Sequence, residues 1–520
     1  MYSLIIKNAT VYDGTGKPGE ALDIAVENDK IVNVDKRLEQ GALEVIDAQN
    51  LALAPGFIDL QNHSDSYWQI FDNPNFESLI TQGYTTILVG NCGASLAPLI
   101  SEQSMLALQK WHSLEGSNIN WSSFKEFLSQ LSRKSFGCNL GSLIGYETIR
   151  RGVVGDQIRS LEKNELRAVI KILEESLDAG AFGLSSGLSY SHEIIISELE
   201  LFELAKIIKK HDRLFSIHLR SEGSEVLEAT EEALDIARTT EVNLKISHLK
   251  VRGQQNFSKF ANLVSDLETA YHQGINAHFD IYPYETIWQV LYSYLPKWAI
   301  EGGRQAMLRH FKDPVQRNKI LLYLNSLDVK FPEIIVASTA NKLSASGKTL
   351  GQIAKNLEIS SEQAVLELIQ NGGSEVLVFE KNLADEQVRE LLFHPLSFVG
   401  TDGAGFGGKP LEKLVHPRCF GTAPRFLKIA RESKFSLESA IKKLTSQPAI
   451  KAGIKNRGEI KVGNFADLVI FDPQKIADRA TYQNPFQFSE GVRHVFVNGK
   501  ATVRDGKITK DMPGFILKKS

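Results

Sequence analysis

"SIHLR" at residues 216–220 and "KISHLK" at residues 245–250 are the stretches that decide the fold of this 520-residue chain. In each stretch a histidine stands at the C-terminal end of a short apolar run, His218 in the first and His248 in the second. A short apolar run is typical of a strand that is buried within a sheet. We therefore expect both histidines to lie at the ends of buried strands.

Two more apolar runs end in residues that can bind a metal ion. "TTILVGNC" at 85–92 leads to Cys92, and "HPLSFVGTDG" at 394–403 leads to Asp402. Four strand-like runs that deliver Cys, His, His and Asp are typical of a metal site at the mouth of a parallel barrel. The pattern predicts a hydrolytic metalloenzyme.

Composition and charge narrow the class of protein without identifying it. Hydrophobic residues make up 42% of the chain and charged residues 23%, as in an ordinary globular protein. The net charge of -3 gives no reason to expect nucleic acid or an anionic membrane as a partner. The three cysteines, Cys92, Cys138 and Cys419, are far apart, which argues against a disulfide framework. With no signal-peptide pattern and no long apolar run, we expect a cytoplasmic enzyme of a small-molecule substrate, with no prediction of its oligomeric state.

The chain divides into two β-rich ends and an alternating middle. Residues 1–54 and 451–520 contain short strands separated by Asp-Gly, Asn-Gly and Gly-Asn turns, and we expect them to form one small β-sandwich. Between them, over 55–450, apolar strands alternate with helical stretches, which indicates βα units around a parallel sheet. The fold class is therefore α/β.

Eight strand candidates in the middle predict a (β/α)8 TIM-like barrel. They lie around 56–63, 85–90, 138–144, 182–184, 214–218, 244–248, 275–280 and 396–400. The interval between the last two is too long for one helix. We expect residues near 285–345, with the aromatic stretch "IWQVLYSYLPKWAIEGG", to be a helical, lid-like insertion.

The residue types at the four strand ends fit zinc chemistry. A catalytic zinc site needs three protein ligands and one position open for water, and Cys92, His218 and His248 supply Cys and His ligands. Asp402 can take the proton of the activated water and pass it to the leaving amine. Taken singly, each residue has a more ordinary interpretation: a structural histidine, a buried thiol or an Asp-Gly turn.

Eight stretches resemble the D-aminoacylases, the N-acyl-D-amino-acid deacylases of the amidohydrolase superfamily. They are "APGFID" (54–59), "VGNCGAS" (89–95), "GAFGLSSGLSY" (180–190), "HLRSEG" (218–223), "ISHLK" (246–250), "DIYPY" (280–284), "HPRCFGTAPR" (416–425) and "ADLVIFDP" (466–473). The resemblance implies zinc held by Cys92, His218 and His248, with Asp402 as general acid/base. It also implies hydrolysis of an N-acyl-D-amino acid to a carboxylate and the free amino acid, and it alone supplies the preference for D over L.

Two residues depart from the family pattern. Members of the superfamily usually end the first strand with His-x-His, but "DLQNHSD" at 59–65 has Gln61 in the first position and His63 in the second. Because a second metal would use both histidines with Asp402, we expect one tight zinc site and a weak or absent second one; Gln61 is instead available to hydrogen-bond water or substrate. Tyr146 replaces a family histidine, which puts one pocket contact in doubt.

The substrate's free carboxylate requires a cation or strong donors. Lys250 lies two residues past His248 and therefore points to the same side, and the resemblance places Tyr282 and Tyr190 near the substrate as well. We expect Arg220 and Glu222 to orient the loop after His218 as a pair. The remaining candidates, His416 and Arg418, either line the mouth or anchor a rigid loop.

Two alternative functions share parts of this pattern. Cyclic-amide hydrolases of the hydantoinase or dihydroorotase type would share the barrel, but they usually bridge two metals with a modified lysine after the fourth strand, where this chain reads "FGLSSGLSY". A catalytically silent, ligand-binding paralogue would explain Gln61 and Tyr146. The intact Cys-His-His-Asp set argues against it.

Overall fold

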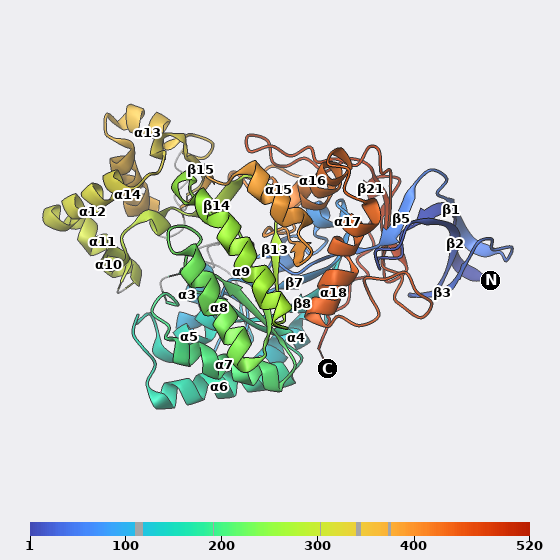
Figure 1. Cartoon of the computed structure of the whole chain (residues 1–520), viewed down its shortest axis with the longest axis horizontal. Helices are drawn as coiled ribbons and strands as arrows, with labels where there is room; N and C mark the ends of the chain where they lie inside the picture. The colour runs from blue at the N-terminus through green and yellow to red at the C-terminus, as the bar shows by residue number, and fades with distance from the viewer. Residues whose placement is uncertain (110–117, 191, 302, 340–344, 373–375, 520) are drawn as a thin grey trace.

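The computed structural model describes residues 1–109, 118–190, 192–301, 303–339, 345–372 and 376–519. Figure 1 shows three parts along the longest axis of the molecule: a β domain that holds the N-terminus, a barrel in the middle, and an inserted part, coloured yellow, at the other end. The barrel is the central part, so its strand ends can meet residues from the insertion.

Parallel strands form the barrel at each of the eight expected positions, in the part of the chain that the structure describes. They are β6 (Phe57–Asp59), β7 (Tyr84–Val89), β8 (Asn139–Ser142) continued by β9 (Ile144–Gly145), β10 (Gly183–Gly187), β11 (Leu214–His218), β12 (Asn243–Ile246), β13 (Ala277–Ile281) and β17 (Ser397–Val399). A parallel bridge between Asn62 and Gly403 joins the ends of β6 and β17 and closes the ring. The expected (β/α)8 barrel is confirmed.

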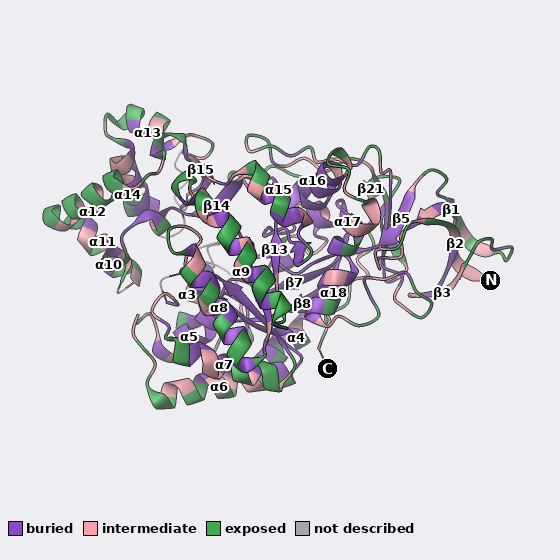
Figure 2. Cartoon of the chain, viewed as in Figure 1, coloured by how far each residue is buried: buried purple, intermediate pink, exposed green. Residues whose placement is uncertain are grey.

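Helices surround the strands. The helices of the barrel are α1 (Gln69–Asp72), α2 (Glu77–Ile80), α3 (Leu106–Gln109), α4 (Phe124–Leu131), α5 (Tyr146–Val154), α6 (Lys163–Asp178), α7 (Glu198–Lys210), α8 (Val226–Thr240), α9 (Phe260–His272), α15 (Asp385–Phe393), α16 (Arg418–Glu432), α17 (Leu437–Leu444) and α18 (Ser446–Ala452). The outer ones, such as α6, alternate buried and exposed residues, and others, such as α16, are mostly buried (Figure 2). In α6, for example, Val169, Leu173 and Leu177 recur every four residues and are fully buried.

The β domain is built from both ends of the chain. Its strands are β1 (Tyr2–Val11), β2 (Glu20–Glu27), β3 (Lys30–Asp35), β4 (Ala42–Asp47), β5 (Ala52–Pro55), β18 (Leu468–Phe471), β19 (Val492–Val497), β20 (Lys500–Arg504) and β21 (Lys507–Ile508). The two ends meet where β5 pairs with β18, with Leu53 opposite Ile470. The last residues leave this domain, because bridges at Pro513 and Ile516 run along the barrel beside β8.

The insertion between β13 and β17 is longer than expected and has its own sheet and core. It contains β14 (Thr286–Val290), α10 (Lys297–Ile300), α11 (Gly303–Lys312), α12 (Pro314–Ser326), β15 (Ile335–Ser338), α13 (Leu350–Leu357), α14 (Ser361–Gly372) and β16 (Leu377–Lys381). The start of the aromatic stretch is a strand where we expected a helix, because β14 pairs antiparallel with β16, some 90 residues later along the chain.

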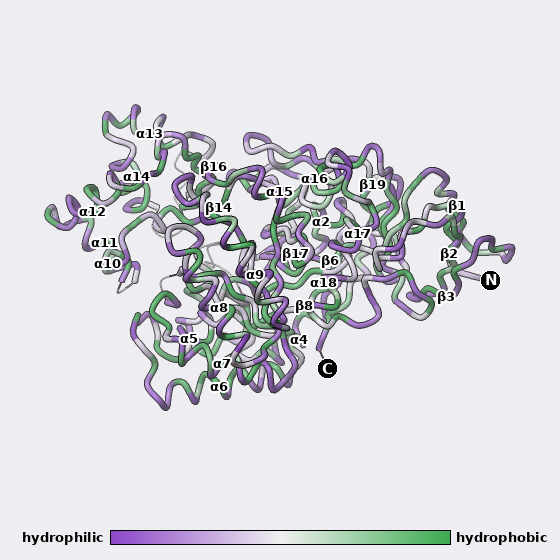
Figure 3. The backbone as a smooth tube through the Cα atoms, viewed as in Figure 1, coloured by the Kyte–Doolittle hydropathy of each residue, from purple (hydrophilic) through white to green (hydrophobic). Residues whose placement is uncertain are grey.

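Hydrophobic segments concentrate at the centre of the molecule, and hydrophilic ones lie on the outer helices and loops (Figure 3). Among the described residues, none of the helices is both long and apolar enough to cross a membrane.

Candidate metal centre and substrate cavity

The ends of four barrel strands bring the candidate residues together. Cys92 follows β7, His218 ends β11, His248 follows β12 and Asp402 follows β17. Cys92, His248 and Asp402 have left-handed backbones, with φ of 52°, 37° and 46°. This conformation costs a non-glycine residue about 1–2 kcal/mol and is typical of functional sites.

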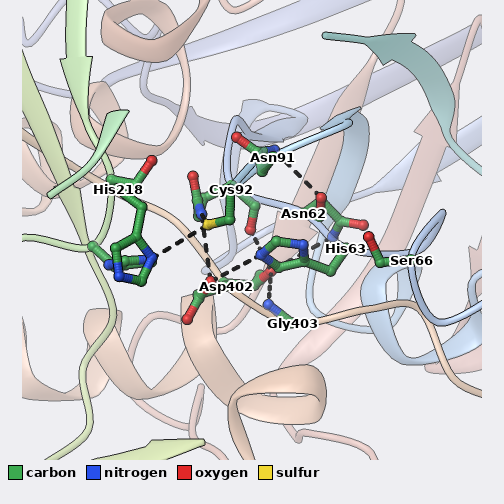
Figure 4. Close-up of polar contacts among 12 residues, drawn as sticks. Asn62, His63, Ser66, Asn91, Cys92, His218, Asp402 and Gly403 are labelled. Atoms are coloured by element: carbon green, nitrogen blue, oxygen red, sulfur yellow. Dashed lines mark hydrogen bonds and ion pairs between the residues drawn. The ribbon is translucent and has the colours of Figure 1, made fainter. Parts of the chain in front are cut away.

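Cys92, His218 and His248 form a group that can hold a metal ion. One potential ligand atom from each lies within 4.8 Å of the others, and all three residues are buried. The Nε2 atom of His248 is 3.5 Å from Sγ of Cys92. The Nδ1 atom of His218 is buried and has no hydrogen-bond partner among the described residues. Figure 4 shows His218 and Cys92 facing the space that Asp402 and His63 also face.

The electrostatics of Cys92 suit a metal ligand. Burial raises the pKa of its thiol, but the neighbouring imidazoles of His248, His218 and His63 outweigh that effect and hold the pKa well below its ordinary value. The thiolate is the form of cysteine that binds metals. A thiolate beside two imidazoles is a donor set that zinc prefers.

Asp402 is held by positive partners on two sides. Its Oδ2 atom accepts from Nη2 of Arg418 at 2.7 Å, and its Oδ1 atom lies 3.1 Å from Nε2 of His63. Burial raises the pKa of this carboxyl, but Arg418, His248 and His63 together lower it well below its usual range. Asp402 is therefore ionised. With His63 and Cys92 it forms a second group of close potential ligand atoms.

Glu222 and Lys250 hold the His248 ring. The Oε1 atom of Glu222 lies 3.1 Å from Nδ1 of His248, and Nζ of Lys250 lies 2.8 Å from the same nitrogen and also bonds to Glu222. Arg220 does not join them as the expected pair; it bonds to Glu232 on α8 at 2.7 Å. Arg220 and Glu222 both line the cavity, and Glu222 is the one that contacts His248.

A buried lysine that we did not single out from the sequence stands beside Gln61. Nζ of Lys245 donates to Oε1 of Gln61 and, at 2.5 Å, to Oδ2 of Asp280. Nε2 of Gln61 in turn donates to Sγ of Cys92 at 3.2 Å and to Oδ1 of Asp402 at 3.4 Å. A signal was present in the sequence, because a lysine between Leu and Ile within a buried strand is unusual.

The centre opens into a cavity of about 720 Å³ between the barrel and the insertion. Arg418 lines it, and its Nε and Nη1 atoms are buried with no hydrogen-bond partner in the described part of the chain. Its guanidinium lies over the Tyr282 ring at 4.7 Å and near the Trp288 ring at 5.8 Å. Two unpaired N–H donors on a buried cation are suited to an anionic group.

The remaining candidates divide between the cavity and the barrel wall. Lys250, Tyr282 and Tyr190 line the cavity, and the Tyr190 ring is 5.2 Å from that of His218. Tyr146 is fully buried and bonds to Glu200. Nε2 of His416 lies 3.0 Å from the Thr286 carbonyl oxygen, and Nδ1 accepts from the backbone N–H of Arg418. His416 therefore anchors the loop, whereas Arg418 faces the cavity.

Known proteins resemble this chain over its whole length. Residues 303–502 match the model of the amidohydrolase family. A D-aminoacylase of Alcaligenes xylosoxydans xylosoxydans is 30% identical over 518 residues, which cover 99% of this chain and 97% of the relative. An N-acyl-D-aspartate deacylase of the same organism is 31% identical over 517 residues, covering 99% and 94%.

The fold is also that of a solved enzyme. The crystal structure of N-acyl-D-glutamate deacylase from Bordetella bronchiseptica, complexed with zinc and a phosphonate inhibitor that mimics the tetrahedral intermediate, superimposes with a TM-score of 0.85. The two sequences are 26% identical, and the match covers 99% of each chain.

Proposed function

Because this chain belongs to the D-aminoacylase family of the amidohydrolases, we propose that it hydrolyses the amide bond of N-acyl-D-amino acids. The products are a carboxylate and a free D-amino acid. The observation that carries this proposal is the placement of two sites on one cavity: a Cys-His-His group beside an ionised carboxylate, and a buried arginine with unpaired N–H donors.

Cys92, His218 and His248 would hold one zinc ion. Two observations support this assignment: the pKa of the Cys92 thiol is lowered, and Nδ1 of His218 has no hydrogen-bond partner within the described ranges. Glu222 supports it as well, because its contact with Nδ1 leaves Nε2 of His248 for the ion. When bound, the ion supplies a Lewis acid that lowers the pKa of water and polarises the amide carbonyl.

Asp402 is the general acid/base. Its ionised carboxylate takes the proton of the attacking water and transfers it to the amide nitrogen, which then leaves as the amine. His63 and Arg418 keep the carboxylate between them, at 3.1 Å and 2.7 Å from its two oxygens. Its oxygen positions are therefore fixed before substrate enters.

Arg418 binds the substrate's free α-carboxylate through one of its two unpartnered nitrogens, Nε or Nη1, which lie on different edges of the guanidinium. Lys250 and Tyr282 line the cavity beside it, with the Lys250 ammonium 5.8 Å from the centre of the Tyr282 ring, and the Tyr190 ring lies next to His218. The outer wall, where the amino acid's side chain extends, is supplied by the insertion, including Trp288 and Tyr294.

A lysine-bridged centre of the cyclic-amide hydrolases is not supported. β10, the fourth strand of the barrel, runs Gly183–Gly187 without a lysine. We therefore retain the linear amide as substrate.

The proposal is tested with zinc-loaded protein and paired N-acetyl-D- and N-acetyl-L-amino acids of Met, Leu, Phe, Asp and Glu. We expect release of the free amino acid from the D series alone, and Asp402→Asn is the matched inactive control. Zinc-loaded protein that hydrolyses neither series would refute the proposal. Equal turnover of both series would refute the D preference.

A further inference from the structure

We propose that Gln61 and Lys245 together take the place of a second metal ion and restrict this centre to one. Gln61 follows β6 and lies against the second ligand group, His63, Cys92 and Asp402. The inference rests on the proposed function, which assigns the one ion to Cys92, His218 and His248.

Lys245 fixes the direction in which the Gln61 amide points. An ammonium group has three donors and no acceptor, and here all three meet oxygens: Oε1 of Gln61, Oδ2 of Asp280 at 2.5 Å and Oγ of Ser247 at 3.3 Å. The carbonyl end of the amide therefore faces Lys245. A reversed amide would bring its NH₂ group against the ammonium, donor against donor.

The other end of the amide meets two acceptors of the second ligand group. Nε2 of Gln61 lies 3.2 Å from the Cys92 sulfur and 3.4 Å from Oδ1 of Asp402, the same oxygen that faces His63. A reversed amide would place its carbonyl oxygen against a thiolate and a carboxylate, which is unfavourable as well. Both ends of the amide thus select one orientation.

This orientation excludes a metal ion from the second group. An amide nitrogen is a hydrogen-bond donor, not a ligand, and its two N–H groups already point at Cys92 and Asp402. A cation at that position would meet these N–H groups, with the buried Lys245 charge behind them. The amide itself connects the sulfur of Cys92 with the carboxylate of Asp402.

The hydrogen bonds that join Gln61, Lys245 and Asp280 also extend to the first ligand group, Cys92, His218 and His248. Asp280, the counterion of Lys245, accepts the backbone N–H of His248 through Oδ1 at 2.7 Å. Lys245 and His248 come from the same segment, β12 and the turn after it. Lys245 and Gln61 are therefore positioning residues, connected to the ligands of the retained ion as well as to Asp402.

The test is the number of zinc ions per chain after equilibrium dialysis against excess zinc. We expect one in the wild type and two in Gln61→Glu, because one carboxylate oxygen keeps the bond to Lys245 while the other replaces Nε2 with an anionic ligand. We also expect two in Lys245→Gln, because the ammonium is gone and the Gln61 amide can turn its oxygen toward the second group. A side-chain N–H of the new glutamine can still donate to Asp280.

Lys443→Gln is the matched control, because Lys443 is another buried lysine of the barrel but donates to the carbonyl oxygens of His394 and Ser397, away from the centre. It should keep one ion. His218→Ala removes only the first group, so Gln61→Glu combined with His218→Ala should bind one.

Two ions in the wild type, or one in Gln61→Glu, would overturn the inference. If the Lys245→Gln variant folds and still binds one zinc ion, Lys245 does not help to exclude the second ion. If Lys245→Gln does not fold, judged by circular dichroism, the isosteric Gln61→Glu decides alone. A wild type that binds no zinc would refute the proposed function instead.

Discussion

Substitution of Arg418 by lysine is the sharpest test of where the substrate's carboxylate binds. The change keeps a cation beside Asp402, whose Oδ2 now accepts from Nη2 at 2.7 Å, but it removes the Nε and Nη1 donors of the planar guanidinium. Hydrogen bonds to charged groups contribute about 1.5–3 kcal/mol each. Because one of these nitrogens donates to the substrate's carboxylate, losing that bond costs about 2 kcal/mol and lowers kcat/KM by about 30-fold.

The assay compares an N-acetyl-D-amino acid with its uncharged carboxamide, for the wild type and for Arg418→Lys. We expect the 30-fold loss with the acid and almost none with the carboxamide, because only the acid engages the missing donors. An equal loss with both substrates would mean that Arg418 acts through Asp402 alone, and the assignment of the carboxylate site would be wrong.

Three further predictions concern other parts of the molecule. Asp402→Asn should lower kcat by about 10²–10⁴-fold and keep zinc, measured by steady-state kinetics and metal analysis; wild-type turnover would remove Asp402 from the reaction. Cys92→Ala should lose both zinc and activity, and unchanged zinc content would exclude Cys92 as a ligand. Burial and nearby Lys451 lower the pKa of His278 to about 3. Since the unfolded histidine titrates near 6.5, folding stability should fall by up to about 1.4 kcal/mol per pH unit as the pH drops from 6.5 toward 3. The His278→Gln variant should show a smaller change of unfolding free energy with pH, measured by urea titration of the metal-free protein. An unchanged pH dependence would mean that His278 does not cause it.

The barrel was predictable from the sequence because its strands are local signals. Several are short apolar runs that lead to a polar or ligand-type residue, as at His218, and parallel strands deliver such ends to one rim. The insertion was less predictable, since Thr286–Val290 becomes a strand only by pairing with Leu377–Lys381. An aromatic run of that length fits a helix as well as a strand until its partner is known.

In the candidate site, too, some features were predictable from the sequence and others were not. Residue type and position were sufficient to predict Cys92, His248 and Asp402 as neighbours. Their left-handed backbones were not predictable, because a positive φ is uncommon for any residue other than glycine, and it arises here under the constraint of the surrounding fold. The contact between Gln61 and Lys245 was also beyond the sequence, since it joins residues 184 positions apart across the barrel.

The pairing of β5 with β18 has a consequence for how the chain assembles during synthesis. Leu53 leaves the ribosome roughly 400 residues before its partner Ile470, and at about 5–20 residues per second that interval lasts about 20–80 s. During this interval β5 has an unpaired edge and an uncovered apolar face. Both features favour strand pairing with other nascent chains. Translation that stops before Leu468 leaves this edge permanently open, so truncated products of this protein should aggregate even where the barrel strands are complete.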